Sequence, residues 1–256
     1  MVDSMRFSMD RLFTFGCSFT KYCWPTWADI LAQSAEHYEN WATPGGGNQY
    51  IFNSLIECHK RNSLTANDTV IIMWTSISRE DRYIRDKGWL TPGSIFNQTD
   101  YDKNFVKNLA DPYGYLIRDL AIISATRMIL DQIGCQWHFL SMVPIEYHDD
   151  STYFKKDLKI TKEIKDLYQI ELDLIKPSVF DTVFNGDWSS RKHLKPQVDD
   201  NHPTPGEHLI YLNTILPQYN ISNDTVNLVK LSDQIVLDNL PFDWQGWKLN
   251  QLGMRF

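Results

Sequence analysis

The segment "DTVIIMWT", residues 68–75, constrains the fold more than any other part of the sequence. It is a continuous run of apolar, largely β-branched residues, without the polar alternation that marks a strand with one face in water. Such a run is typical of a strand that is buried on both faces. Strands of this kind lie in parallel sheets that carry helices on both sides, so the segment predicts an α/β fold.

The segments around this run alternate between strand-like and helix-like patterns. Strands are expected at 11–16, 37–42 and 135–143, and helices at 25–35, 47–61 and about 114–133. An alternation of this kind predicts a three-layer α/β/α arrangement with a mainly parallel central sheet.

We expect a single domain over residues 1–256, since a chain of this length can bury one large core. Two polar stretches with aromatic residues, about 77–113 and 145–198, are long for simple connections and are interpreted as insertions that face a substrate. The tail, about 240–256, is too aromatic for a disordered end. We expect it to dock on the body of the protein or on a neighbouring subunit of an oligomer.

Charge argues against nucleic acid as a partner. The formal net charge is −7, and the lysines between 155 and 165 are interleaved with acidic residues, which is typical of a solvated helix face. The N-terminal segment carries charges where a signal peptide needs an apolar run, and charges also interrupt the most apolar stretch, 115–130. We therefore expect no membrane partner and take a cytoplasmic location as the default.

The cysteines give no indication of a metal or a disulfide framework. The sequence has four of them, with no C-x-x-C pair and no histidine at zinc spacing: Cys17, Cys23, Cys58 and Cys135. No metal and no other cofactor is expected.

Polar residues follow three of the expected strands at the point where each strand ends. Ser18 follows the first strand, Gly45–Gly47 and Asn48 follow the second, and Thr75 with Ser76 follows the third. Ligands of parallel sheets gather outside the carboxyl ends of the strands. These loops therefore predict one site at one edge of the sheet.

A fourth contribution to this site is expected late in the chain, in "DDNHPTPGE", residues 199–207. Thr204, Pro205 and Glu207 form a capping-box pattern, which predicts a helix that begins at Pro205, with His202 just before it. A serine hydroxyl is a weak nucleophile without an adjacent base, and His202 is the candidate base for Ser18. Asp199 or Asp200 can bind the other ring nitrogen and fix the tautomer.

These residues resemble the blocks of the SGNH, or GDSL-type, esterases and acylhydrolases. Residues 15–20, "FGCSFT", are similar to the first block, with Cys17 in place of its aspartate, and 199–203, "DDNHP", are similar to the last. The resemblance implies a flavodoxin-like fold with Ser18 as nucleophile, His202 as base and Asp199 as orienting acid, Asp200 being the fallback. "ATPGGGN" is similar to the second block, so that the backbone N–H groups of Ser18 and Gly45 would donate to an oxyanion hole.

One departure from the family concerns the third oxyanion donor. The family's third block places an asparagine after the third strand, whereas here the strand ends "MWTS", residues 73–76. The hydroxyl of Thr75 or Ser76, or the Asn48 amide, is the expected substitute. Trp74, in this same segment, is interpreted either as part of the core or as a wall of the substrate pocket.

Arg79 follows the same strand. It is expected either to bind an anionic group of the substrate or to pair with Glu80 or Asp81.

The family resemblance implies a serine hydrolase that removes an acyl group, acetyl being favoured, from a small ester or a glycan. Two alternatives stay open: a catalytically weak or inactive carbohydrate-binding or structural module on the same fold, and an acyltransferase. Four aromatic residues are candidates for a carbohydrate-stacking surface, although packing is the favoured interpretation of each: Tyr22, Trp24, Trp89 and Tyr113.

Overall fold

The computed structural model describes residues 9–96, 101–145, 162–188, 201–238 and 242–255. Four parallel strands form its central sheet in the order β2-β1-β3-β6. Their bounds are β1 Met9–Phe15, β2 Ala35–Asn40, β3 Asp68–Trp74 and β6 Gln136–Ser141. The predicted α/β class and the parallel sheet are confirmed, and β2 begins two residues earlier than its expected range.

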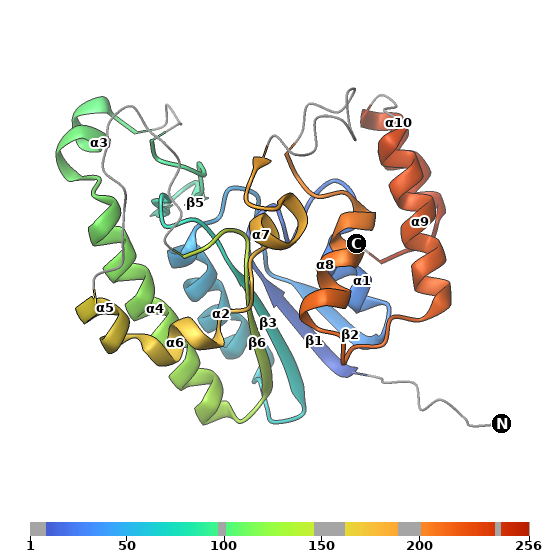
Figure 1. Ribbon diagram of the computed structural model, residues 1–256, viewed down its shortest axis with the longest axis horizontal. Coiled ribbons are helices and arrows are strands. Elements are labelled where there is room, and N and C mark those ends of the chain that lie inside the picture. The colour runs from blue at the N-terminus through green and yellow to red at the C-terminus, as the bar shows by residue number, and fades with distance from the viewer. Residues whose placement is uncertain (1–8, 97–100, 146–161, 189–200, 239–241, 256) are drawn as a thin grey trace.

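Helices cover both faces of this sheet (Figure 1). One face carries α1 Trp27–Ala32, α7 Val179–Phe184 and α8 Pro205–Ile215, with α9 Asn223–Leu237 packed on α8. The other face carries α2 Asn48–Asn62 and α4 Pro112–Ile133, with α6 Gln169–Leu174 packed on α4. The sheet is thus flanked by helices on both sides, as the alternation predicts.

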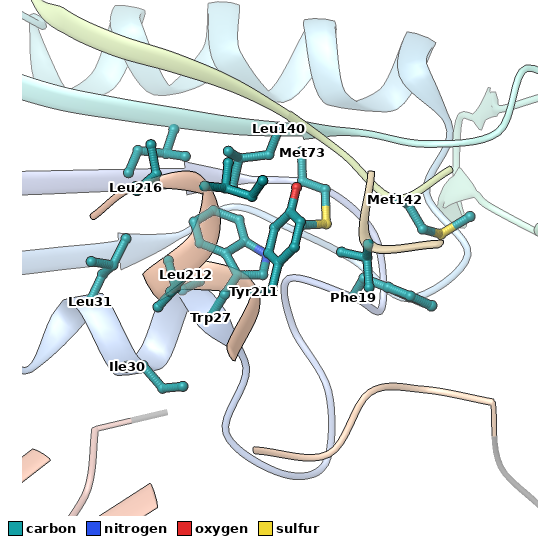
Figure 2. Packing of buried hydrophobic residues seen from close by; sticks show 14 of the residues in the cluster. Phe19, Trp27, Ile30, Leu31, Met73, Leu140, Met142, Tyr211, Leu212 and Leu216 are labelled. Atoms are coloured by element: carbon teal, nitrogen blue, oxygen red, sulfur yellow. The ribbon is translucent and has the colours of Figure 1, made fainter. Parts of the chain in front are cut away.

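The burial of strand β3 on both faces explains why polar and apolar residues do not alternate in its sequence. All seven of its residues are buried, and successive side chains enter different cores. Ile71 and Met73 join the cluster between the sheet and α1 and α8, whereas Val70, Ile72 and Trp74 join the cluster against α2 and α4. Figure 2 shows the first of these clusters, with Met73 beside side chains of α1 and α8. A strand between two apolar layers needs apolar residues on both of its faces, as at positions 70–74.

Both expected insertions contain secondary structure of their own. Residues 77–113 hold the antiparallel hairpin of β4 Arg82–Ile84 and β5 Gly88–Leu90, and then α3 Lys103–Leu109. This segment has a small core against α4 that includes Ile77, Ile95 and Val106. Residues 145–198 hold α5 Lys162–Leu167, α6 and α7. The hairpin, α3 and α7 lie toward the end of the sheet where the strands finish (Figure 1).

The C-terminal tail docks on the body of the protein. Its helix, α10 Phe242–Gln251, places Leu249 against Trp24 and Val236. Beyond the helix, Met254 enters the core between the sheet and α1, and the Arg255 guanidinium donates to the Ala35 carbonyl oxygen at 2.9 Å. Of the two expected docking surfaces, the body of the protein is the one that the structure shows, and a contact with a neighbouring subunit stays a prediction.

All four cysteines are free thiols. Within the described parts of the chain, no group of three or more histidine, cysteine, aspartate or glutamate side chains is placed to hold a metal ion. No helix among the described residues is both long enough and apolar enough to cross a membrane.

Candidate active site

Ser18 lies in a tight turn directly after β1. The backbone N–H groups of Thr20 and Lys21 both donate to the Cys17 carbonyl oxygen, at 2.9 and 3.0 Å, which folds the chain back after the strand. A side chain at Gly16 would collide with the Thr20 side chain, so this close return requires glycine. The turn presents the Ser18 hydroxyl at the carboxyl edge of the sheet.

His202 is positioned by the start of α8. The predicted capping box is present: the Thr204 N–H donates to the Glu207 carboxylate at 2.7 Å, and the Glu207 N–H donates to Thr204 Oγ1 at 3.3 Å. Trp24 Nε1 donates to the Pro203 carbonyl oxygen at 2.8 Å, which ties this segment to the loop after β1. The helix start and this bond together place His202 beside Ser18.

The two candidate catalytic side chains are in hydrogen-bond contact. His202 Nε2 lies 2.8 Å from Ser18 Oγ, although 184 positions separate the residues in the sequence. In the tautomer with its proton on Nδ1, the imidazole accepts this bond from the hydroxyl. That is the arrangement in which histidine removes a proton from a nucleophilic serine. Asp199 and Asp200, the candidate orienting acids, lie outside the described residues, and their role stays a prediction.

Two aromatic rings pack against the imidazole of His202. Tyr22 stacks on it with ring centroids 3.9 Å apart and an interplanar angle of 16°, and Phe19 lies 5.3 Å away at 49°. Tyr22 thus has one face covered by His202, and Trp24 is only 3% exposed. Of the two alternatives for Trp24, packing in the core is therefore the one observed, and a stacking surface for sugars is excluded for this ring.

The other two stacking candidates belong to the insertion side of the molecule. Tyr113 is partly buried against the small core on α4. Trp89 lies in the hairpin with its ring edge-on to Tyr50 and to Tyr83, which is 65% exposed. Trp89 thus has an exposed aromatic neighbour and stays a candidate for stacking.

The glycine loop after β2 runs tightly against the segment after β3. Gly45 has a φ of +75°, and a side chain there would collide with the Thr91 carbonyl oxygen. Gly47 N–H and Tyr50 N–H each donate to the Asp81 carboxylate at 2.9 Å, so Asp81 caps the start of α2. The loop is thereby fixed close to the edge that carries Ser18. The oxyanion role of the Gly45 and Ser18 N–H groups stays a prediction.

Asn48 does not supply the third oxyanion donor. Its side-chain N–H₂ donates to the Thr75 carbonyl oxygen at 3.1 Å and to Asp119 Oδ2 at 2.7 Å, and its oxygen accepts from the Thr75 N–H at 2.9 Å. Both amide hydrogens are therefore used inside the protein, and the side chain is fully buried. This expectation is wrong, because Asn48 instead anchors the end of β3 to α2 and α4.

The remaining residues at the end of β3 are buried. Trp74 is fully buried in the core, edge-on to Phe139 with centroids 5.4 Å apart, so the pocket-wall alternative is wrong. Ser76 Oγ accepts from the Ser78 N–H at 3.2 Å and retains its own hydrogen for donation. Thr75 Oγ1 is buried and has no partner within the described chain. A donor role for either hydroxyl stays a prediction.

Arg79 does not make the pair that the sequence suggests. Its guanidinium donates to the Gly46 carbonyl oxygen at 2.7 Å and lies 3.7 Å from Met142 Sδ. Glu80, one expected partner, pairs instead with Arg82 at 2.8 Å and Arg118 at 3.2 Å. No carboxylate of the described residues forms an ion pair with Arg79.

Sequence reasoning missed the buried carboxyl groups that support these loops. Burial raises the pKa of Asp119 to about 6, although Arg118 Nε donates to it at 2.7 Å. Burial also raises the pKa of Asp81, although two backbone N–H groups donate to it. A signal for Asp119 was present: it shares one face of an apolar helix with Leu116 and Leu120. A carboxylate in such a position needs buried partners.

Comparison with known proteins does not assign the chain to a family, because no family model and no curated protein matches it. The site is therefore interpreted from its own geometry. It joins a hydroxyl and an imidazole at the edge where four parallel strands end, beside a glycine loop and an arginine. A serine with an adjacent histidine is the pair that acyl transfer through a covalent intermediate requires.

Proposed function

We propose that this chain is a serine hydrolase of the SGNH, or GDSL, type, which cleaves acyl esters. The observation that carries the proposal is the 2.8 Å contact between Ser18 Oγ and His202 Nε2. The contact lies at the carboxyl edge of a parallel sheet, where ligands of such folds bind. The order of the loops along the chain supports the same assignment, since the glycine loop and the end of β3 fall between the serine and the histidine.

In the proposed reaction, Ser18 Oγ attacks the carbonyl carbon of the ester while His202 Nε2 takes the hydroxyl proton. The carbonyl electrons move onto oxygen, and the N–H groups of Ser18 and Gly45 stabilise this oxyanion. The intermediate then releases the alcohol, which receives the proton from His202, and leaves an acyl group on Ser18. Water, deprotonated by His202, hydrolyses the acyl-enzyme. Asp199, or Asp200, would hold the imidazole.

The substrate class is an ester of a small acyl group, with acetyl as the first candidate, on a small alcohol or a glycan. The proposal needs no metal and no organic cofactor, since the nucleophile and the base are both protein side chains. An acyltransferase would use the same acyl-enzyme and differ only in the alcohol that replaces water as acceptor.

A second function, carbohydrate binding without turnover, is favoured by exposed aromatic side chains. Trp244 and Trp247 on α10 are 61% and 57% exposed, with ring centroids 6.2 Å apart. Exposed rings of this kind stack on apolar faces of ligands. In a binding module, the Ser18–His202 pair would have no measurable role.

The test is hydrolysis of p-nitrophenyl acetate by the wild type, Ser18→Ala and a control, Ser232→Ala. Ser232 is a buried serine of α9 that bonds only to a carbonyl oxygen of its own helix, so its loss probes folding alone. We expect Ser18→Ala to lower kcat by about 10⁴-fold and Ser232→Ala to leave it within about twofold. A fluorophosphonate should label the wild type and not Ser18→Ala. Equal rates for wild type and Ser18→Ala would contradict the proposal of a serine hydrolase. Binding of a glycan by both proteins would then support the binding module.

A further inference from the structure

The Arg79 guanidinium lies at the edge of the sheet where Ser18 lies. It contacts the Gly46 carbonyl oxygen, in the loop after β2, and Met142 Sδ, directly after β6. In the strand order β2-β1-β3-β6, β2 and β6 are the outer strands, and Arg79 itself follows β3. The guanidinium therefore joins segments that follow both outer strands, at the end of the sheet where Ser18 follows β1.

Two short links connect this guanidinium to the proposed oxyanion donors. Met142 Sδ also lies 3.5 Å from Cys17 Sγ, and Cys17 directly precedes Ser18. Gly46, which accepts from Arg79 at 2.7 Å, directly follows Gly45. Figure 2 shows Met142 with Phe19, which follows Ser18, at the same end of the apolar cluster. The guanidinium therefore contacts the residue after Gly45 directly and is linked to the residue before Ser18 through Met142 Sδ.

Arg79 forms no ion pair with a carboxylate of the described residues. Its two hydrogen-bond partners there, a carbonyl oxygen and a thioether, are both uncharged. Glu80 pairs with Arg82 and Arg118, and Asp81, whose pKa is raised by burial and lowered in part by the charge of Arg79, accepts its hydrogen bonds from backbone N–H groups. A guanidinium has five N–H donors, so donors remain for an anion.

We propose that Arg79 is the third donor of the oxyanion hole, in place of the asparagine that the loop after β3 lacks. This inference rests on the proposed esterase function. When Ser18 attacks, the carbonyl electrons move onto oxygen, and the Arg79 guanidinium donates a hydrogen bond to that oxygen. The electrons return when the alcohol leaves, and Arg79 keeps its protons throughout. Charge-assisted bonds are stronger than those from a neutral amide, so one arginine can replace an asparagine.

The test compares wild type, Arg79→Ala, Arg79→Lys and the control Arg82→Ala on two esters. Arg82 is an arginine of the same segment whose side chain is 52% exposed and pairs with Glu80. The esters are p-nitrophenyl acetate, which is neutral, and mono-p-nitrophenyl succinate, which carries a carboxylate. We expect Arg79→Ala to lower kcat by about 10²- to 10³-fold on both esters, with KM within about threefold.

Further readouts separate an oxyanion donor from a structural role. We expect Arg79→Lys to retain an intermediate kcat, methylguanidinium to restore part of the activity of Arg79→Ala, and Arg82→Ala to stay within about twofold of wild type. If Arg79→Ala does not fold by circular dichroism, Arg79→Gln takes its place, and we expect it to show the same loss of kcat with little change in KM, while Arg79→Lys keeps its intermediate kcat.

Three outcomes decide the matter. A kcat for Arg79→Ala within about tenfold of wild type would overturn the inference, with the hydrolase intact if Ser18→Ala is inactive. A rise in KM confined to the succinate ester would also overturn it, because Arg79 would then bind a substrate carboxylate. If the wild type is no faster than Ser18→Ala, the proposed function itself fails, and the inference with it.

Discussion

The central sheet uses charged residues in different ways at its amino edge, where the parallel strands begin, and at its carboxyl edge, where they end. At the amino edge, Arg11 of β1 and Asp68 of β3 are register partners, and two guanidinium nitrogens each donate to the Asp68 carboxylate at 2.6 Å. At the carboxyl edge, the Arg79 guanidinium contacts a carbonyl oxygen and a thioether. At the amino edge the arginine thus forms a two-bond ion pair, whereas at the carboxyl edge Arg79 forms no ion pair with a described carboxylate.

The ionisation of the carboxyl groups follows the same division. Burial alone would raise the pKa of Asp68, but hydrogen bonds from Arg11 and Thr65 outweigh it, and the pKa is lowered. At the carboxyl edge, burial outweighs the bonds from Arg118 and Asn48, and the pKa of Asp119 is raised to about 6. The carboxylate of Asp68 thus stabilises the amino edge. At the carboxyl edge, Asp119 holds its loops in place although its burial disfavours the ionised carboxylate.

The largest effect should come from breaking the amino-edge pair with Asp68→Ala. This change leaves Arg11 unpaired and removes the acceptor of the Thr65 N–H. We expect the free energy of unfolding to fall by about 3 kcal/mol, with kcat per folded molecule unchanged. Urea denaturation and active-site titration with a fluorophosphonate measure the two quantities. A large fall in kcat per labelled site would show that the two edges are not independent.

The pH dependence of stability should have opposite signs at the two edges. Asp119 has a raised pKa in the folded protein, so its contribution is fully present below about pH 4 and is lost as the pH rises through about 6. The stability of wild type relative to Asp119→Asn should therefore fall by about 2 kcal/mol between pH 4 and 7. Asp68 has a lowered pKa, so the stability of wild type relative to Asp68→Asn should rise with pH on the acid side of about pH 4.

Urea denaturation of the three proteins from pH 3 to pH 8 measures both dependences. The proposed contrast between the amino and carboxyl edges is contradicted if the stability of wild type relative to Asp119→Asn and relative to Asp68→Asn changes with pH in the same direction. It also fails if the curve for Asp119→Asn is flat between pH 4 and 7, since burial would then not dominate the ionisation of Asp119.

A smaller effect is expected from Asp81, which positions the glycine loop without touching the substrate. Asp81→Ala removes the acceptor of the Gly47 and Tyr50 N–H groups at the start of α2. We expect kcat to fall by about tenfold with KM nearly unchanged, because the misplacement of an oxyanion donor affects the transition state. The matched control is Asp102→Ala, which removes a cap from α3, where the aspartate also accepts from two backbone N–H groups. Its kcat should be unchanged.

The sequence predicted those features of the fold that local pattern determines. The run at 68–75 becomes β3, and the Thr204–Glu207 capping box starts α8 at Pro205, because both depend on residues close together in the chain. The hairpin of β4 and β5 was not predicted, because its strands have three residues each and no apolar face that a pattern would reveal.

The site was predictable only where one residue type suits one chemical task. Ser18 and His202 were paired from the sequence because together, with the glycine loop between them, they resemble the serine and histidine blocks of one family, and the structure places the two side chains in contact. Asn48 and Arg79 were misjudged because their partners, Asp119 and Met142, come from distant elements. Which donor meets which acceptor across such distances depends on strand order, which a single sequence leaves open.

The smallest effect should come from the ring that supports His202. At the carboxyl edge Tyr22 stacks on the imidazole, whereas His37, at the edge of the sheet in β2, is 51% exposed and contacts only the Glu39 carboxylate by hydrogen bonding. Tyr22→Leu loses the flat surface that holds the base, worth about 1 kcal/mol, and should lower kcat about fivefold. Tyr22→Phe keeps the ring and should match wild type, as should His37→Gln. Equal losses for Tyr22→Phe and Tyr22→Leu would mean that the hydroxyl matters and the stacking does not, since only the leucine variant lacks the ring.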